Sequence, residues 1–153
     1  MSTPEQRLAE RGLTLPPVPA PVAAYVPAVR TGSLVYTSGQ LPLVDGALPA
    51  TGKVGAQVSA ERARELAGVC AVNGLAAVAA VAGGLSAVRR VVKVVGFVAS
   101  APDFTGQPRV VDGASELLGH VFGDAAAHAR SAVGVAVLPL DAPVEVELIV
   151  EVG

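Results

Sequence analysis

The feature that most constrains the fold of this chain is a regular alternation of apolar and other residues near its C-terminus, from His128 to Val152. A period of two residues is typical of a β-strand that turns one face toward a core. In the second half of the stretch, one face carries Val144, Val146, Leu148 and Val150, and the other carries Glu145, Glu147 and Glu151. Between the halves, the prolines and the aspartate of residues 139–143 favour a turn. The stretch therefore predicts two strands, of which the second is half-buried and has an acidic face.

The first half of the stretch combines one cation with very small side chains. Arg130, Ala132, Gly134 and Ala136 share one face, and Val133, Val135 and Val137 share the other. A face of alanine and glycine leaves volume to be filled, and an arginine at its edge suits a carboxylate, which a guanidinium binds with two parallel hydrogen bonds. This pattern favours a pocket for a small carboxylate. The alternative is that the small residues let a helix or a neighbouring sheet pack closely, and that Arg130 pairs with one of the chain's own glutamates.

Length and cysteine content favour one cytoplasmic domain. A chain of 153 residues is long enough to bury roughly two-thirds of its unfolded surface without a disulfide or a metal. Its one cysteine, Cys70, lies in an apolar helical segment, so we expect a buried side chain rather than a catalytic thiol. His120 and His128 have no cysteine or second histidine at ligand spacing, which disfavours a metal site. The N-terminus carries acidic residues where a signal peptide carries basic ones, so we expect the protein to stay in the cytoplasm.

Charge and hydropathy restrict the expected partners. The formal net charge is -2 and only 3% of the residues are aromatic, so both the basic field and the stacking platform of a nucleic-acid-binding protein are missing. The longest apolar run, residues 74–85, is shorter than the ~20 residues that a membrane-spanning helix needs. Because 52% of the residues are hydrophobic and 16% are charged, we expect copies of the same chain to cover part of the surface.

The remaining patterns predict an α+β domain over residues 25–153, preceded by an N-terminal arm over residues 1–24. The arm begins with a short helix and continues with prolines that favour an extended chain over packed structure. Strands are expected within residues 25–40, with a turn at 31–33, and at 88–99; helices are expected at 59–81 and at 108–122, ended by Gly83 and Gly123. The side chains of the first helix that we expect to face the sheet are Leu66, Val69, Cys70, Asn73 and Ala76. Both helices would cover one face of a single mixed sheet and leave the other face bare.

Two blocks of the chain run in register with a known family. They are Tyr25-Val with Leu34-Val-Tyr-Thr-Ser-Gly-Gln-Leu-Pro42, and Ala129-Arg-Ser-Ala-Val with Leu138-Pro-Leu-Asp-Ala-Pro-Val-Glu-Val-Glu147. The blocks resemble the RidA (YjgF) family of enamine/imine deaminases, which is also called the endoribonuclease L-PSP family. The resemblance implies a chorismate-mutase-like α+β domain, a mixed sheet backed by two helices. It also implies a homotrimer whose sheets meet in a central barrel and so cover the bare face.

The resemblance also implies a set of site residues. Arg130 matches the family's carboxylate-binding arginine, and Glu145 matches the glutamate that positions the attacking water. Tyr25, Ser38 and Gly39 match residues that line the same cleft. Read without the resemblance, Glu145 is a solvated carboxylate on a strand face, Tyr25 packs at an edge and Ser38 caps a turn.

The chain departs from the family's pattern near this site. Ala132 stands where many members have cysteine, Asp112 stands where an asparagine is common, and Pro27-Ala28 replaces a polar Gln-Gly pair. Asp112 and Ala132 are therefore expected at the substrate-binding cleft, where Asp112 adds a second negative charge. Together with the N-terminal arm and an insertion at residues 106–109, these departures resemble a longer, divergent branch of the family.

The implied function is hydrolytic deamination of 2-imino and enamine acids to 2-keto acids and ammonia, without a cofactor. The alternative, which Asp112 and Ala132 favour, is a non-catalytic binder or sensor of small carboxylates in the same intersubunit cleft. A third role attached to the family, that of a ribonuclease or translation inhibitor, is disfavoured by the negative charge and the lack of a basic groove.

Strand register predicts that the site lies between subunits. If residues 130–138 and 144–152 form a simple hairpin around Asp141, then Arg130 lies opposite Val152 and Glu145 lies opposite Val137, an offset of seven residues. At about 3.3 Å per residue, the two side chains are roughly 20 Å apart in one subunit. Arg130 of one chain and Glu145 of its neighbour would then have to serve one substrate.

Overall fold

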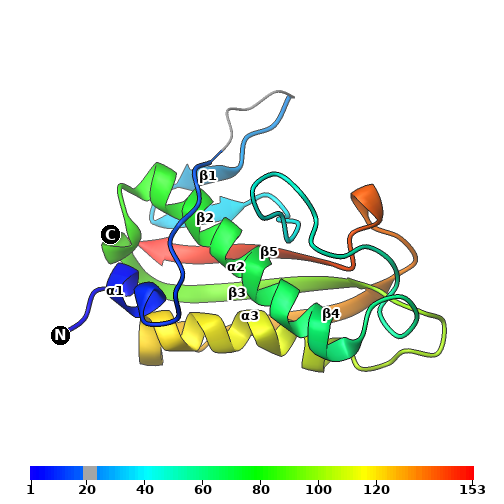
Figure 1. Cartoon of the computed structure of the whole chain (residues 1–153). Coiled ribbons are helices and arrows are strands. Elements are labelled where there is room, and N and C mark those ends of the chain that lie inside the picture. The colour runs from blue at the N-terminus through cyan, green and yellow to red at the C-terminus, as the bar shows by residue number, and fades with distance from the viewer. Residues whose placement is uncertain (19–23) are drawn as a thin grey trace.

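The computed structural model describes residues 1–18 and 24–153 and contains a five-stranded mixed sheet with two long helices on one face (Figure 1). In chain order the elements are α1 (Pro4–Ala9), β1 (Ala28–Thr31), β2 (Leu34–Thr37), α2 (Ala60–Ala82), β3 (Val88–Ala99), α3 (Gln107–Phe122), β4 (Ala129–Val135) and β5 (Val144–Val152). Short 3₁₀ turns lie at Leu85–Ala87, Gly123–Ala126 and Pro139–Asp141. The order of strands across the sheet is β1-β2-β5-β3-β4, and β3 and β4 are the parallel pair. The predicted α+β class, with one mixed sheet and two helices, is confirmed.

The ends of the two long helices follow from local chemistry. The Ser59 side chain accepts a hydrogen bond from the backbone N–H of Arg62 and so caps the first turn of α2. At the other end, Gly83 takes the left-handed conformation (φ 85°) and donates its N–H to the carbonyl of Ala79. Gly123 ends α3 in the same position relative to the helix. The predicted helix boundaries therefore agree with the structure to within a residue or two.

The predicted hairpin of the last two strands is wrong, because β3 lies between β4 and β5. β3 is antiparallel to β5 and parallel to β4, so β4 is an edge strand (Figure 1). Residue alternation reports which face of a strand is buried, but it carries no information about which strand is its neighbour. The connection through α3 decides the pairing: it returns the chain to the start of β3, and β4 then runs alongside β3 in the same direction.

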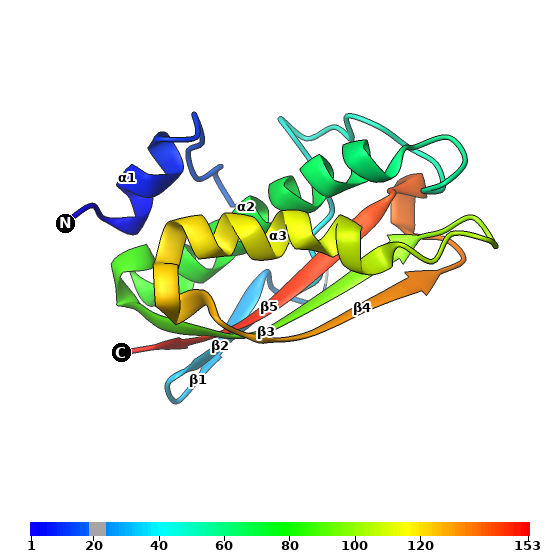
Figure 2. The same cartoon turned by 90° about the horizontal axis from the view of Figure 1, so that it is seen from below.

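The core lies between the sheet and the two helices, which lie side by side on the same side of it (Figure 2). The inward side chains of β5, from Val144 to Val152, are all buried, as the alternation predicts. In α2, Leu66, Cys70 and Ala76 are buried as predicted, but Val69 and Asn73 are only half-buried. Asn73 instead donates hydrogen bonds to the carbonyls of Leu41 and Leu43 in the loop after β2, because that loop, and not the sheet, faces this side of the helix.

Helix α2 is also apolar enough, by length and composition, to cross a membrane. It has 23 residues, and an 18-residue stretch within it has a mean hydropathy of 1.8. Core helices share this property, and 56% of the apolar stretch is buried inside the fold.

Small residues let α3 lie close to the sheet and to α2. A Cβ on Gly96 of β3 would collide with the side chain of Val111 in α3, and a Cβ on Gly113 of α3 would collide with the backbone carbonyl of Arg64 in α2. Ala132 of β4 packs against the same core. The small-residue face of β4 is therefore a packing surface for a helix, which was one of the two interpretations that the sequence allowed.

The N-terminal segment packs against the helices rather than extending freely. Leu8 of α1 is buried, the Arg7 guanidinium donates to the carbonyl of Val121 at the end of α3, and the Glu5 carboxylate accepts from the N–H of Leu85. The predicted helix at the start of the arm is confirmed, and it packs beside α3, where Leu8 is part of the core. The predicted extension at Pro19 and Pro21 lies outside the described residues.

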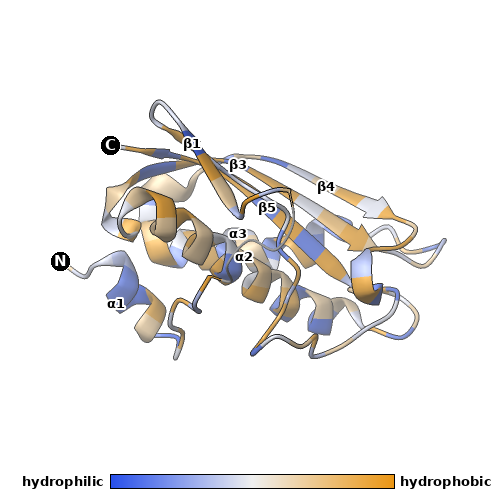
Figure 3. Ribbon diagram, turned by 90° about the horizontal axis from the view of Figure 1, so that it is seen from above, coloured by the Kyte–Doolittle hydropathy of each residue, from blue (hydrophilic) through white to orange (hydrophobic). Residues whose placement is uncertain are grey.

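The opposite face of the sheet has no helix on it (Figure 2). Val29, Tyr36 and Val133 on this face are exposed by 53%, 43% and 45%. Phe97 and the three glutamates of β5 on the same face are half-buried. In Figure 3 the strands are largely hydrophobic, with isolated hydrophilic positions. This open face of the sheet, as we call it below, is the surface that the sequence predicts to be bare.

Candidate active site

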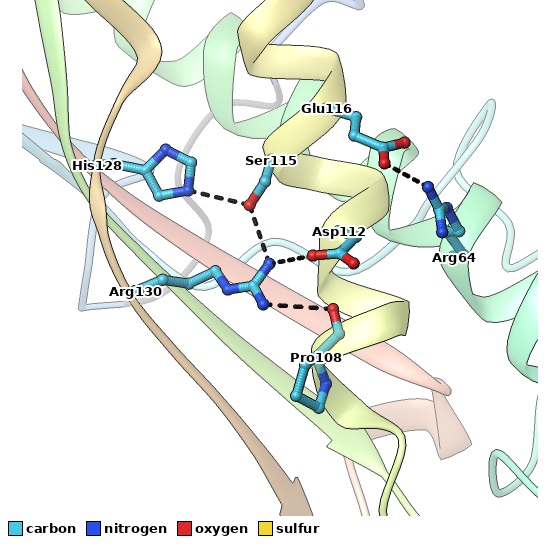
Figure 4. A network of polar contacts seen from close by, with 7 residues as sticks. All are labelled: Arg64, Pro108, Asp112, Ser115, Glu116, His128 and Arg130. Atoms are coloured by element: carbon cyan, nitrogen blue, oxygen red, sulfur yellow. Dashed lines mark hydrogen bonds and ion pairs between the residues drawn. The ribbon is translucent and has the colours of Figure 1, made fainter.

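Arg130 projects from the edge strand β4 toward α3, not toward the open face. It lies opposite Val94 of β3, a residue that is fully buried under the helices. Its Nη1 donates to Asp112 Oδ1 at 2.7 Å and to Ser115 Oγ at 3.2 Å, and its Nη2 donates to the carbonyl of Pro108 at 3.4 Å (Figure 4). The guanidinium is thus held by three groups from the first turns of α3. The sequence predicted a free arginine or one paired with a glutamate; the partner is an aspartate.

Ser115 and His128 extend this network away from Asp112. The Ser115 hydroxyl lies 3.0 Å from His128 Nε2, and His128 Nδ1 bonds to the carbonyl of Ala126 (Figure 4). Because a carbonyl only accepts, Nδ1 carries the proton of the neutral ring, and Nε2 then accepts from Ser115. The serine oxygen is thereby oriented to accept from Arg130. Sequence reasoning assigned no role to either residue, although the spacing of Asp112 and Ser115 already puts both on one face of a helix.

Asp112 lies where the sequence comparison expects it, in direct contact with Arg130. Its side chain is 40% exposed and that of Arg130 is 23% exposed. One turn further along the helix, Glu116 forms an ion pair with Arg64 of α2 (Figure 4). Glu116, and more weakly Asp112, raise the pKa of the Arg64 guanidinium. Asp112 and Glu116 of α3 therefore each pair with an arginine, Asp112 with Arg130 of β4 and Glu116 with Arg64 of α2.

Glu145 lies on the open face, beside a bulge after β2. We call its position against Gly39 the seat of Glu145. Tyr36 pairs with Ile149 and Gln40 pairs with Val146, so the β2 side of this pairing has one residue more than the β5 side. The extra length pushes Ser38 and Gly39 out beside Glu145. A Cβ on Gly39 would overlap Glu145 Oε1 and would lie 2.9 Å from its Cδ. Only glycine leaves room for the carboxylate in this position.

The Glu145 carboxylate is partly desolvated and lacks a hydrogen-bond donor among residues 1–18 and 24–153. Burial raises its pKa above the ordinary value, and repulsion from the Glu147 carboxylate raises the pKa further. A carboxylate with a raised pKa and free lone pairs is suited to accept a proton from water. The reading of Glu145 as an ordinary solvated carboxylate does not account for this seat.

Ser38, next to Gly39, binds the chain segment that follows Tyr25. The Ser38 hydroxyl donates to the carbonyl of Val26 at 2.6 Å, and its N–H donates to the carbonyl of Pro27. Ser38 therefore ties the bulge to the segment before β1, which is the cap that the sequence allowed. Tyr25 is 69% exposed. Its side chain is available to line a cleft.

The predicted site residues thus form two groups in one chain. Arg130, Asp112 and Ala132 lie under α3 at the β4 edge, while Ser38, Gly39 and Glu145 lie near the end of β2, and Tyr25 directly precedes Val26, whose carbonyl Ser38 binds. Through β3, Arg130 is level with Val94 and Glu145 is level with Phe97, three residues along and two strands across. These offsets put the two Cα atoms about 14 Å apart, and the side chains leave the sheet on opposite faces. The predicted offset of seven residues and separation of roughly 20 Å are wrong, because β3 lies between the two strands, but the two side chains still lie apart within one chain, on opposite faces of the sheet.

A groove of about 680 Å³ lies elsewhere, on the outer side of the helices. The segment after α1, the loop after β2 and the facing sides of α2 and α3 line it, and it includes none of the seven predicted site residues. In the part of the chain that the structure describes, no three His, Cys, Asp or Glu side chains come together as a metal site. Cys70 is buried, and burial raises the pKa of its thiol well above the ordinary value, so it is not a reactive thiolate.

Comparison with known proteins identifies the family. The profile described as "YjgF/chorismate_mutase-like, putative endoribonuclease" matches residues 5–152. The chain belongs to the RidA/YjgF family. It is 38% identical, over 86% of its length and 89% of the relative's, to 2-iminobutanoate/2-iminopropanoate deaminase of Salmonella typhimurium. The expected family and its chorismate-mutase-like fold are confirmed.

Two other RidA/YjgF relatives match over nearly the whole chain. Protein TCP17 of Trypanosoma cruzi is 43% identical over 93% of this chain and 89% of its own. The crystal structure of Atu1372 from Agrobacterium tumefaciens, a protein of unknown function, superposes with a TM-score of 0.92 and 48% identity, covering 98% of this chain and 92% of that one. Because the Atu1372 match covers 98% of this chain, it extends into the N-terminal segment.

Proposed function

We propose that this protein is a hydrolytic deaminase of 2-imino acids, and of the enamines that tautomerise to them, working in the cytoplasm as a homotrimer. The observation that carries the proposal is the seat of Glu145: a half-buried carboxylate with a raised pKa and no donor among the described residues, fitted against Gly39. The similarity to a 2-iminobutanoate/2-iminopropanoate deaminase supports the reaction class.

The reaction requires a carboxylate anchor and a general base. Arg130 binds the carboxylate of the 2-imino acid, and Glu145 orients a water molecule and takes its proton as the oxygen attacks the C=N carbon. The imine reacts in its protonated form, so the resulting carbinolamine carries an OH and an NH₂ group on one carbon. The proton from Glu145 then passes to that nitrogen, the C–N bond breaks and ammonia leaves, and the Glu145 carboxylate takes the hydroxyl proton as the C=O of the 2-keto acid forms. Because the raised pKa of Glu145 brings the base closer to neutral pH, it favours this proton transfer.

Both groups serve one substrate only if a second copy of the chain supplies one of them. In a single chain Arg130 and Glu145 point to opposite faces of the sheet. A closed ring, in which the β4 edge of one copy reaches the open face of the next, brings Arg130 to the partner subunit's Glu145. The exposed Val29, Tyr36 and Val133 on the open face favour such an assembly, because joining copies there removes apolar surface from water.

Turnover tests the reaction and the role of Arg130 together. An amino-acid oxidase generates 2-imino acids in situ, and the purified protein is expected to accelerate release of the 2-keto acid. Arg130→Lys is expected to lose most of this acceleration with the fold intact, because an ammonium cannot reproduce the planar fork of the guanidinium. Full activity of the lysine variant would contradict the role of Arg130.

Subunit mixing tests the shared site. Arg130→Ala and Glu145→Ala proteins are each expected to be inactive, and subunit exchange between them is expected to restore part of the activity, because some interfaces then contain both wild-type groups. Mass spectrometry verifies the exchange. Two inactive variants that exchange and do not complement would rule out a site built from two subunits.

A second candidate function is a binder or sensor of small carboxylates that does not turn them over. The contact between Asp112 and Arg130 favours it, since the anchor already has a carboxylate partner within its own chain. Protection against thermal unfolding by a small carboxylate, without turnover of any imino acid, would select this function.

A further inference from the structure

The proposed carboxylate anchor lies in a cluster whose formal charges cancel. Arg130 contacts Asp112, Arg64 contacts Glu116, and the negative charge of Asp112 also acts on Arg64. A ligand carboxylate that binds Arg130 therefore enters beside another carboxylate. The site is electrostatically unlike an arginine in a basic or neutral pocket, where any small anion would be favoured.

Arg130 and Asp112 each keep some hydrogen-bonding atoms free of partners among the described residues. Both hydrogens of Arg130 Nη1 are used, by Asp112 Oδ1 and Ser115 Oγ, and Nη2 uses one hydrogen on the Pro108 carbonyl. The Nε hydrogen and the second Nη2 hydrogen have no acceptor among the described residues, and these two can bind a carboxylate side by side. On Asp112, Oδ1 binds Arg130, and Oδ2 has no donor among the same residues. The pair thus offers two donors on one edge of the guanidinium and one anionic acceptor beyond its Nη1 end.

We propose that Asp112 is a specificity-determining residue, which makes this site select carboxylates that carry a positively charged nitrogen on the adjacent carbon. The proposal rests on the proposed carboxylate-binding role of Arg130 and adds the class of ligand. In a 2-amino acid or a protonated 2-imino acid, the nitrogen is attached to the carbon next to the carboxylate. Binding the carboxylate at the free Nε–Nη2 edge places the cationic nitrogen one edge of the guanidinium away from Asp112, which is bound at Nη1, so the two opposite charges attract across roughly 6–8 Å.

Such selectivity separates substrate from product in the proposed reaction. A protonated 2-imino acid is a zwitterion with no net charge, whereas the 2-keto acid that remains after hydrolysis is an anion with no cationic nitrogen. Asp112 stabilises the first and repels the second. The product leaves once the nitrogen is lost as ammonia, and 2-keto acids already present compete poorly for the site.

Binding of two nearly isosteric ligands tests the proposal without turnover. Calorimetric titrations with L-2-aminobutanoate and L-2-hydroxybutanoate, at neutral pH and low ionic strength, compare an ammonium with a hydroxyl at the same carbon. The wild-type protein is expected to bind the amino acid more tightly by about three- to tenfold, the effect of attraction between two opposite charges roughly 7 Å apart near the protein surface. In Asp112→Asn this ratio is expected to fall to near one or to invert, because the affinity for the hydroxy acid rises as the affinity for the amino acid falls.

Glu116→Gln provides the matched control. It removes the same charge from the same helix, one turn later, but from the partner of Arg64 rather than of Arg130. The control is expected to keep the wild-type ratio. Circular dichroism and thermal unfolding of each variant verify that the fold is intact.

Three results would overturn the proposal. They are a wild-type protein that binds the hydroxy acid as tightly as the amino acid, an Asp112→Asn variant with an unchanged ratio, and folded proteins that bind neither ligand. A uniform gain for both ligands in Asp112→Asn would mean that Asp112 only occupies Arg130, and would also refute selectivity. Failure of the proposed function is distinguishable: selective binding of the amino acid with no turnover of imino acids leaves the selectivity intact and removes the deaminase activity.

Discussion

Replacing Gly39 by alanine is expected to move the Glu145 carboxylate without unfolding the protein. The added Cβ would overlap Glu145 Oε1 and lie 2.9 Å from Cδ and 3.2 Å from Cγ. These atoms belong to the far end of a flexible side chain, so Glu145 rotates away at a cost of about 0.5–1.5 kcal/mol in rotamer strain. Alanine also reduces the entropy of the unfolded chain, which stabilises the folded state by about 0.4–1 kcal/mol. The free energy of unfolding is therefore expected to change by no more than about 1 kcal/mol.

The same change is expected to have a large effect on catalysis. Once displaced, Glu145 no longer holds the attacking water, and loss of a positioned general base lowers kcat by about 10²- to 10⁴-fold. Its carboxylate also moves into water, so the pKa of Glu145 is expected to fall back toward the ordinary value for glutamate. Urea denaturation measures stability, release of 2-keto acid measures kcat, and ¹³C NMR of the glutamate carboxyl groups measures the pKa.

Gly119→Ala is the control for this experiment, since the same substitution in α3 meets no atom within 4 Å. It is expected to keep kcat and to stabilise the protein by about 0.5–1 kcal/mol, because alanine is the better helix former. If Gly39→Ala kept full activity and an unchanged Glu145 pKa, the claim that Glu145 is positioned against Gly39 would be refuted. A loss of several kcal/mol in stability would show instead that Gly39 is needed for folding.

Three further predictions concern stability and assembly. Gly96→Ala is expected to lower the free energy of unfolding by about 1–3 kcal/mol, because the added methyl group overpacks against Val111. In urea titrations, the double variant Gly96→Ala/Val111→Ala is expected to be at least about 1 kcal/mol more stable than the sum of the two single losses implies. Strict additivity of the two losses would contradict the contact between these residues. Burial raises the pKa of Glu145 in the folded state, so ionising this carboxyl group at higher pH lowers the stability of the wild-type protein. Glu145→Gln is therefore expected to be more stable than wild type at pH 7, and the difference is expected to disappear below the ordinary glutamate pKa of about 4.3. An unchanged or lower urea midpoint of Glu145→Gln at pH 7 would argue against this. Light scattering at micromolar concentration is expected to give the mass of a trimer, and a monomer mass would remove the shared site.

Much of the architecture could be predicted from the sequence because it depends on local chemistry. The strict alternation in β5 correctly assigned Val144 and its apolar neighbours to the core and the glutamates to the other face. Ser59 and Gly83 marked the ends of α2 through capping, which involves only the adjacent backbone. Two sequence blocks sufficed to identify the family, since the T-S-G-Q and R-S-A-V segments lie at fixed positions along the chain.

The site itself depended on long-range packing that no local pattern reports. Alternation could not reveal that β3 separates β4 from β5, because both arrangements bury the same side chains. The partner of Arg130 was decided by how closely α3 approaches the sheet, and Gly96 and Ala132 permit that approach only in the assembled fold. The position of Glu145 likewise depends on a bulge that brings Gly39 of one strand against another. Local sequence determined which faces are apolar and where the helices end, whereas tertiary packing decided which charged groups meet, because the residues that meet are far apart along the chain.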